Sequence, residues 1–331
     1  MVVRSESFDL REIVPAGPVG KFSDPDWTAK GERRAMVPLV GLATLWINTG
    51  TLCNITCRNC YIESSPTNDR LAYITAAEAA PFLAEAQALG VREIGFTGGE
   101  PFLNPEFLEM VEAALARGFA ALILTNAMLP MQRAAIKRGL TALEARYAGR
   151  LALRVSVDHY TKALHETERG AGSWEKALAG LDWLSGNGFR VTIAGRLCWN
   201  ESEADARAGY ARLIAERGWA IDARDHSQLV LFPEMDGNRD VPEITAACWG
   251  ILNKHPSQVM CATSRMVVKR KGAKAPAVLP CTLLPYDPKF EMGVTLAEAA
   301  TADGGMFDKG AVKLCHPHCA KFCVLGGASC S

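Results

Sequence analysis

The chain has 331 residues and balances 36 Lys and Arg against 36 Asp and Glu, so its formal net charge is zero. A nucleic-acid-binding protein normally carries a basic footprint, and a membrane span needs an apolar run of roughly 20 residues. The sequence shows no overall basic excess and no such run. Hydrophobic residues make up 49%, enough for a large core. We expect a cytoplasmic protein with one large α/β domain, a small appendage and no nucleic-acid or membrane partner.

The 11 cysteines are an odd number, and residues 1–7 are polar rather than typical of a signal peptide. In a reducing cytosol, clustered cysteines bind metals or act in catalysis more often than they form disulfides. The cysteines therefore predict metal sites rather than a disulfide network.

Residues 1–41 are predicted to be an N-terminal extension, and residues 42–235 alternate short β-rich runs with helical patterns. The predicted strands are Ala43–Asn48, Glu93–Thr97, Ala121–Thr125, Leu151–Val157, Arg190–Gly195 and Gln228–Phe232. The predicted helices are Ala76–Leu89, Pro105–Arg117, Met131–Tyr147, Ser173–Asn187 and Glu203–Arg217. Thr75 and Glu78 have the spacing of a capping box at a helix start. Six strands alternating with helices indicate a parallel sheet, either open and doubly wound or a partial barrel.

Three cysteines follow the first predicted strand with the spacing C-x3-C-x2-C: Cys53, Cys57 and Cys60. Thiolates select soft metal sites, chiefly Zn, Cu(I) and iron–sulfur clusters. A four-iron cluster normally takes four cysteines, so a loop with three leaves one iron open to a ligand that is not protein. The alternative is structural zinc, which needs four closed ligands; its fourth would be a distant cysteine or His159.

The second predicted strand ends in Thr97-Gly-Gly-Glu-Pro101. Ligands collect at the carboxyl ends of parallel strands, so this segment and the cysteine loop should meet there. Adjacent glycines permit close backbone approach, and Glu100 is a fixed acceptor beside them. Taken alone, the segment also suits a tight strand-to-helix turn.

The cysteine spacing followed by Tyr61, together with the Gly-Gly-Glu-Pro segment, resembles the radical SAM superfamily. In that family, S-adenosylmethionine (SAM) chelates the open iron of a [4Fe-4S] cluster through its amino and carboxylate groups. The resemblance implies that the cluster ligands are Cys53, Cys57 and Cys60. It also implies cofactor-binding roles for Tyr61, Gly98, Gly99, Glu100 and Pro101. In that reading the glycines line the SAM site and Glu100 orders the methionyl amine.

Later strand ends fit the family less specifically. Thr125-Asn126 is similar to a Thr-Asn-Gly segment of the family, with Ala127 in place of the glycine, and Ser156-Val-Asp158 resembles a Ser-x-Asp segment that meets SAM or substrate. Residues 165–170 and 172–174 match larger peptide- and sulfatase-modifying members. The resemblance implies that Arg196 and Asn200 reach the SAM ribose or carboxylate. Ordinary loop hydrogen bonding is the alternative for each.

After Pro233 the alternation stops. Cys261 and Cys281 bracket a predicted β-hairpin over Met266–Leu279, whose basic run at 269–274 suits a solvated tip near Gly272 rather than a nucleic-acid patch. A helix is predicted at Thr295–Ala300. Four cysteines then follow in the last 17 residues: Cys315, Cys319, Cys323 and Cys330. A metal would tie down this terminus.

Cysteines from a hairpin and a terminal loop look like the auxiliary iron–sulfur domain called Twitch, or its larger relative SPASM. The spacing C-x3-C-x3-C-x6-C departs from the usual SPASM spacing, which leaves open whether one or two auxiliary clusters are bound. We predict one [4Fe-4S] cluster, held by Cys261, Cys281 and two of the four terminal cysteines. Zinc with His316 or His318 is the alternative. The predicted fold is a partial (β/α)6 TIM-like barrel at 42–235 and a cysteine-rich α+β domain at 236–331.

Cys198 follows the fifth predicted strand and Cys248 precedes Trp249. Free buried cysteine is common in protein cores, and we favour core packing for both. Because Cys198 lies at a strand's carboxyl end, it is also a candidate hydrogen-atom donor to a substrate radical.

The resemblance implies reductive cleavage of SAM to a 5′-deoxyadenosyl radical, with electrons from a donor such as flavodoxin or ferredoxin. An auxiliary cluster favours a net oxidation or a bond-forming modification. The substrate is expected to be a small metabolite or a peptide, and we prefer the metabolite because 41 residues are few for a leader-binding domain. The rivals are a non-catalytic iron–sulfur electron carrier or scaffold and a zinc-stabilised binding module.

Overall fold

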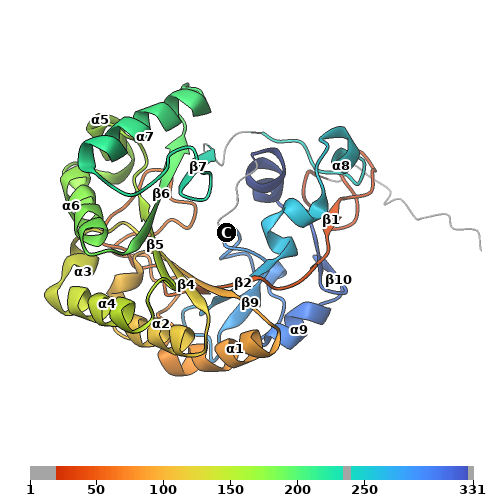
Figure 1. Cartoon of the computed structure of the whole chain (residues 1–331). Coiled ribbons are helices and arrows are strands. Elements are labelled where there is room, and N and C mark those ends of the chain that lie inside the picture. The colour runs from red at the N-terminus through yellow and green to blue at the C-terminus, as the bar shows by residue number, and fades with distance from the viewer. Residues whose placement is uncertain (1–19, 234–239, 327–331) are drawn as a thin grey trace, which may run out of the picture.

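The computed structural model describes residues 20–233 and 240–326. Its main feature is an eight-stranded sheet with the order β7-β6-β5-β4-β3-β2-β8-β9. Six of these strands are consecutive in the chain and parallel: β2 (Thr44–Asn48), β3 (Glu93–Thr97), β4 (Ala120–Thr125), β5 (Leu151–Ser156), β6 (Arg190–Leu197) and β7 (Leu229–Pro233). The sheet curves into an open barrel with helices on its outer surface (Figure 1). The predicted partial (β/α)6 TIM-like barrel is confirmed.

The barrel strands are joined by α1 (Ala76–Ala88), α2 (Phe107–Ala116), α3 (Leu129–Gln132), α4 (Ala134–Arg146), α5 (Lys162–Arg169), α6 (Ser173–Gly186) and α7 (Glu203–Arg217). The predicted capping box begins α1. Thr75 Oγ1 accepts from the Glu78 amide at 3.2 Å, and Glu78 Oε2 accepts from the Thr75 amide at 3.0 Å. These bonds satisfy two amides that the helix start would otherwise leave without acceptors.

Two helices differ from the prediction. The single helix expected over Met131–Tyr147 is broken into α3 and α4, because Arg133 is extended (ψ 137°) and its Nε donates to Pro130 O at 2.9 Å. The helix α5 was not predicted, because only two of its eight residues, Ala163 and Leu164, are apolar. The residues that α5 buries are His165 and Glu168.

The predicted hairpin is confirmed by β8 (Ser264–Val268) and β9 (Ala277–Leu279), which pair antiparallel. The structure adds that β8 pairs parallel with β2, so the hairpin extends the barrel sheet at its β2 edge. The predicted helix near residue 295 is α9 (Leu296–Thr301), and α8 (Cys248–Ile251) precedes the hairpin.

A small second sheet joins distant parts of the chain. It has the order β1-β11-β10, formed by β1 (Met36–Val37), β10 (Phe307–Asp308) and β11 (Ala311–Lys313). A buried ion pair, Arg34 Nη2 to Glu243 Oε1 at 2.7 Å, lies beside it. Residues of the predicted N-terminal extension therefore pack with the C-terminal region.

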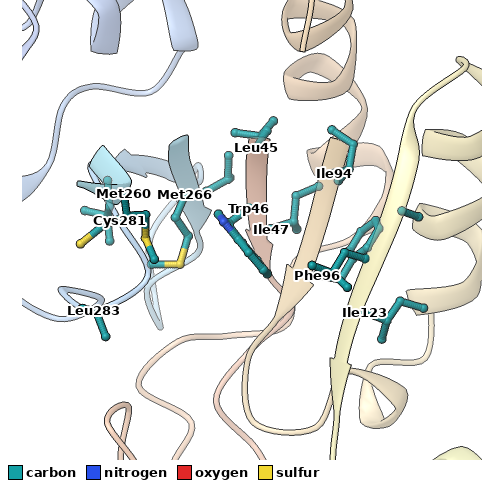
Figure 2. Close-up of a cluster of buried hydrophobic side chains, with 14 of the residues drawn as sticks. Leu45, Trp46, Ile47, Ile94, Phe96, Ile123, Met260, Met266, Cys281 and Leu283 are labelled. Atoms are coloured by element: carbon teal, nitrogen blue, oxygen red, sulfur yellow. The ribbon is translucent and has the colours of Figure 1, made fainter. Parts of the chain in front are cut away.

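One hydrophobic core runs from the barrel into the hairpin (Figure 2). Fully buried Trp46 of β2 pairs in register with Gly95 of β3 on one side and with Met266 of β8 on the other. A Cβ on Gly95 would come within 2.4 Å of the indole, so the glycine makes room for the ring. Within the described ranges, no helix has the length and apolarity to cross a membrane.

Candidate active site

A pocket opens at the carboxyl ends of the barrel strands. It holds about 1180 Å³ of empty space, counting its mouth. Ten predicted site residues line it: Cys53, Cys57, Cys60, Tyr61, Gly98, Gly99, Asn126, Ser156, Asp158 and Arg196. The carboxyl ends of the strands thus bring the two main motifs to one place. Four other residues predicted for the SAM site or its chemistry do not line it: Glu100, Pro101, Cys198 and Asn200. The described C-terminal cysteines do not line it either.

The cysteine loop after β2 is held from α5. Glu168 accepts from the Asn59 side chain at 2.9 Å, and its carbonyl accepts from the Arg58 amide at 2.8 Å. From β6, Arg196 Nη2 donates to Asn59 O at 2.9 Å. The segment between Cys57 and Cys60 is therefore anchored by an element that the sequence did not predict as a helix.

The Gly-Gly segment after β3 touches the same loop, backbone against backbone. The Gly99 amide donates to Gly50 O at 2.8 Å, and the Glu100 amide donates to Leu52 O at 3.1 Å. A Cβ on Gly99 would lie 2.2 Å from Leu52 O. Gly98 has φ +145°, and a Cβ there would lie 2.5 Å from Gly50 O. Both positions need glycine, because any side chain would push the cysteine loop away.

Glu100 does not line the pocket, and its carboxylate links the end of β3 to the end of β4. It is 1% exposed and accepts from Thr125 Oγ1 at 2.8 Å and from the Asn126 amide at 2.9 Å. Burial raises its pKa to about 7, although these donors favour the carboxylate. Contact between Glu100 and SAM stays a prediction.

Two arginines share one carboxylate in the pocket wall. Asp158 Oδ2 lies 2.7 Å from Arg169 Nε, and Asp158 Oδ1 lies 3.4 Å from Arg196 Nε. Burial raises the pKa of Asp158, but the two guanidinium charges outweigh it and hold that pKa below its usual range. The wall therefore carries a net positive charge, which suits a carboxylate ligand. Arg169 and pocket-lining Arg154 were not predicted as site residues. Arg169 is the last residue of α5, and the likeness of segment 165–170 to larger members of the family was the signal available for it.

The donor set fits an iron–sulfur cluster with SAM. Burial raises the pKa of Cys53 to about 12 and also raises that of Cys57, so both thiols keep their protons at neutral pH until a metal displaces them. Arg196 Nη1 is buried and has no hydrogen-bond partner among the described residues, and it lies at the pocket wall. Such an orphaned donor suits a bound acceptor.

A closed zinc site does not fit this loop. In residues 20–233 and 240–326, no three His, Cys, Asp or Glu side chains converge on a single ion. His159 is engaged at both ring nitrogens, by Thr161 Oγ1 at 2.8 Å and Glu201 Oε1 at 3.0 Å. A cluster takes each cysteine on a different iron, so its ligands need not converge on one point.

A second group of cysteines gathers in the C-terminal region. Burial raises the pKa of Cys319 well above its usual value, and the charges of Cys281, Cys261 and Cys315 raise it further. All four thiols are buried, and the other three lie within electrostatic reach of Cys319. Cys323 is half-buried, and Cys330 lies outside the described residues. No disulfide joins the ten described cysteines.

The C-terminal region also forms one wall of the barrel pocket. Met260 beside Cys261, Leu283 close to Cys281, and Phe322 of the π-helix Cys319–Leu325 all line it. The end of this helix reaches the far edge of the barrel, where a Cβ on Gly326 would lie 2.9 Å from the Pro233 side chain. The two cysteine groups therefore flank one cavity.

A family model described as the radical SAM superfamily matches residues 47–207. The AdoMet-dependent heme synthase of Oleidesulfovibrio alaskensis is 26% identical over 142 residues, 43% of this chain and 34% of the relative. The antilisterial bacteriocin subtilosin biosynthesis protein AlbA of Bacillus subtilis is 29% identical over 146 residues, 43% of this chain and 30% of the relative. The chain thus matches about a third of the length of these relatives.

Solved structures extend the likeness to the fold. The structure of anSMEcpe with bound AdoMet aligns with TM-score 0.57 and 16% identity over 78% of this chain and 80% of that one. Streptococcus suis SuiB aligns with TM-score 0.55 and 13% identity over 77% of this chain and 64% of its own. With the cysteine loop, the Gly-Gly-Glu-Pro segment and the family match all on one barrel, the chain belongs to the radical SAM superfamily.

Proposed function

We propose that the protein is a radical SAM oxidoreductase that modifies a small metabolite or a peptide, with a [4Fe-4S] cluster on Cys53, Cys57 and Cys60. When bound, cluster and SAM supply reductive cleavage of SAM to a 5′-deoxyadenosyl radical, which abstracts hydrogen from the substrate. The match covers only part of the relatives' length and supports membership of the family. The activity is inferred from the site.

The contact between Gly98-Gly99 and the cysteine loop carries the proposal. Backbone hydrogen bonds hold the two motifs together at the edge of a pocket that residues of both motifs line. An electron carrier needs no such cavity beside its cluster, and a zinc-stabilised module needs convergent ligands. The geometry therefore favours an enzyme over both rivals.

The protein groups bind and orient within this pocket. Arg196, with its orphaned Nη1, is placed to bind the SAM carboxylate, while Asp158 offsets part of the arginine charge. Asn126 and Ser156 offer polar contacts, and Asn126 is held by Asn54 Oδ1 at 2.9 Å. The apolar wall of Met260, Leu283 and Phe322 excludes water from the reacting atoms.

We further propose that one auxiliary [4Fe-4S] cluster is held by Cys261, Cys281, Cys315 and Cys319. Four cysteines close all four irons, so this site serves electron transfer rather than SAM binding. A role as electron acceptor supports a net oxidation. Peptide substrates have structural parallels, because SuiB was solved with the precursor peptide SuiA and anSMEcpe with the Kp18Cys peptide. The heme synthase relative supports a metabolite equally.

The direct test is SAM cleavage. The protein is purified and reconstituted without oxygen, its iron and sulfide are measured, and dithionite and SAM are added. Formation of 5′-deoxyadenosine is expected, with flavodoxin or ferredoxin able to replace dithionite. The triple Cys53, Cys57 and Cys60→Ala variant is the control and should form none. Zinc alone in the wild-type protein, or equal turnover by the control, would overturn the proposal.

A further inference from the structure

Arg265 is a fully buried cation beside the C-terminal cysteines. It lies on β8, where it pairs in register with Leu45 of β2. Its side chain is 1% exposed. Burying a guanidinium without a counter-charge is costly, so its surroundings should reveal the charge that it faces.

The partners of Arg265 are carbonyl groups rather than carboxylates. Nη1 donates to Cys261 O at 2.6 Å and to Ser264 O at 2.8 Å, and Nη2 donates to Gly310 O at 3.0 Å. Nε is buried and has no hydrogen-bond partner in the described ranges. Across the same ranges, no Asp or Glu forms an ion pair with this guanidinium.

Two cysteines of the proposed auxiliary site lie next to Arg265. Its Nη1 contacts the carbonyl of Cys261, and the register that pairs Met266 with Leu279 brings Cys281, two residues beyond Leu279, to the start of β8. The cation therefore has its counter-charge when the cysteines are ionised, which is the state that binds metal.

We propose that Arg265 is the buried counter-charge of the auxiliary cluster and raises its reduction potential, with Nε donating to a sulfur of the cluster site. This inference rests on the proposed auxiliary [4Fe-4S] cluster. One-electron reduction makes the cluster more negative by one unit, so a fixed neighbouring cation stabilises the reduced form more than the oxidised form. Net charge and hydrogen bonds to sulfur are established determinants of cluster potentials.

The test isolates the auxiliary cluster. In the Cys53, Cys57 and Cys60→Ala background, full-length protein is reconstituted and titrated with dithionite while the electron paramagnetic resonance of the reduced cluster is recorded. Arg265→Gln removes the charge, and Arg265→Lys keeps the charge but removes the Nε donor. Lys289→Gln is the matched control, because it removes an exposed cation near Cys315.

The glutamine variant should lower the equilibrium constant for reduction at least tenfold, a shift of about 59 mV to more negative potential. The lysine variant should shift in the same direction by less, and the Lys289 control should change less than twofold. If the glutamine variant fails to fold, Arg265→Met replaces it as the uncharged variant of similar length, and an unchanged potential in that variant overturns the inference. An unchanged potential in the glutamine variant, with iron content intact, also overturns it but leaves the proposed function standing. Absence of iron from the background protein would instead refute the auxiliary cluster.

Discussion

The two cysteine groups differ in how their ligands are brought together and in how charge is balanced around them. Cys53, Cys57 and Cys60 come from a single loop and face an open pocket, where Asp158 offsets two arginines. The C-terminal group combines four buried cysteines from three separate segments, beside an arginine with no carboxylate partner among the described residues. Three ligands beside a cavity suit chemistry on a bound molecule, whereas four buried ligands suit electron transfer.

The largest expected effect separates these two roles. Cys57→Ala should lower 5′-deoxyadenosine formation by more than about a thousandfold, because the SAM-binding cluster loses a ligand. Cys319→Ala should lose the auxiliary iron yet retain SAM cleavage within about tenfold. Iron analysis and product quantification measure both. Equal loss of SAM cleavage in the two variants would contradict the division of roles.

Substitution of Asp158 tests the charge balance at the barrel site. Asp158→Asn leaves the guanidinium groups of Arg169 and Arg196 without their shared counter-charge and should reduce the free energy of unfolding by about 3 kcal/mol. Glu112→Gln, which removes an exposed ion pair with Arg146, should cost below about 1 kcal/mol. Denaturant titration compares them, and similar losses would argue against a buried charge network.

The pH dependence of the free energy of unfolding tests whether Glu100 has a raised pKa in the folded protein. Its folded pKa of about 7 lies above the ordinary glutamate value, so between roughly pH 4.5 and 7 the folded state binds more protons than the unfolded state. Its contribution to stability is therefore full below pH 4.5 and declines by about 3 kcal/mol as the pH rises to 7. Unfolding titrations across this range should show a decline in the wild-type protein that Glu100→Gln lacks. Parallel pH profiles would refute this role.

The smallest effect concerns the contact between the two barrel motifs. Gly99→Ala should destabilise the protein by about 2 kcal/mol, because the added Cβ meets Leu52 O, and should lower iron retention. Gly186→Ala at the end of α6 meets nothing within 4 Å and should be neutral or slightly stabilising. Thermal melts and iron analysis measure the pair. If Gly99→Ala changes neither the thermal stability nor the iron retention, the two loops do not need this close approach.

Local pattern was enough to predict the barrel and its main motifs. The alternation of β-rich and helical runs predicted six strands, and the rule that ligands collect at strand ends predicted that Cys53 and Gly99 meet. Where apolar residues were few, as in α5, or where one non-helical residue broke a helix, as at Arg133, the prediction was wrong. Local propensity carries no information on a helix held mainly by its contacts with a distant loop.

The amino-acid order determined the cysteine spacing, the glycine pair and the capping box, because each depends on neighbours a few residues apart. Tertiary structure decided which C-terminal thiols meet, that the hairpin joins the barrel at β2, and that Arg265 is buried among them. These facts depend on how segments far apart in the chain pack together. Spacing within any one segment does not encode that packing.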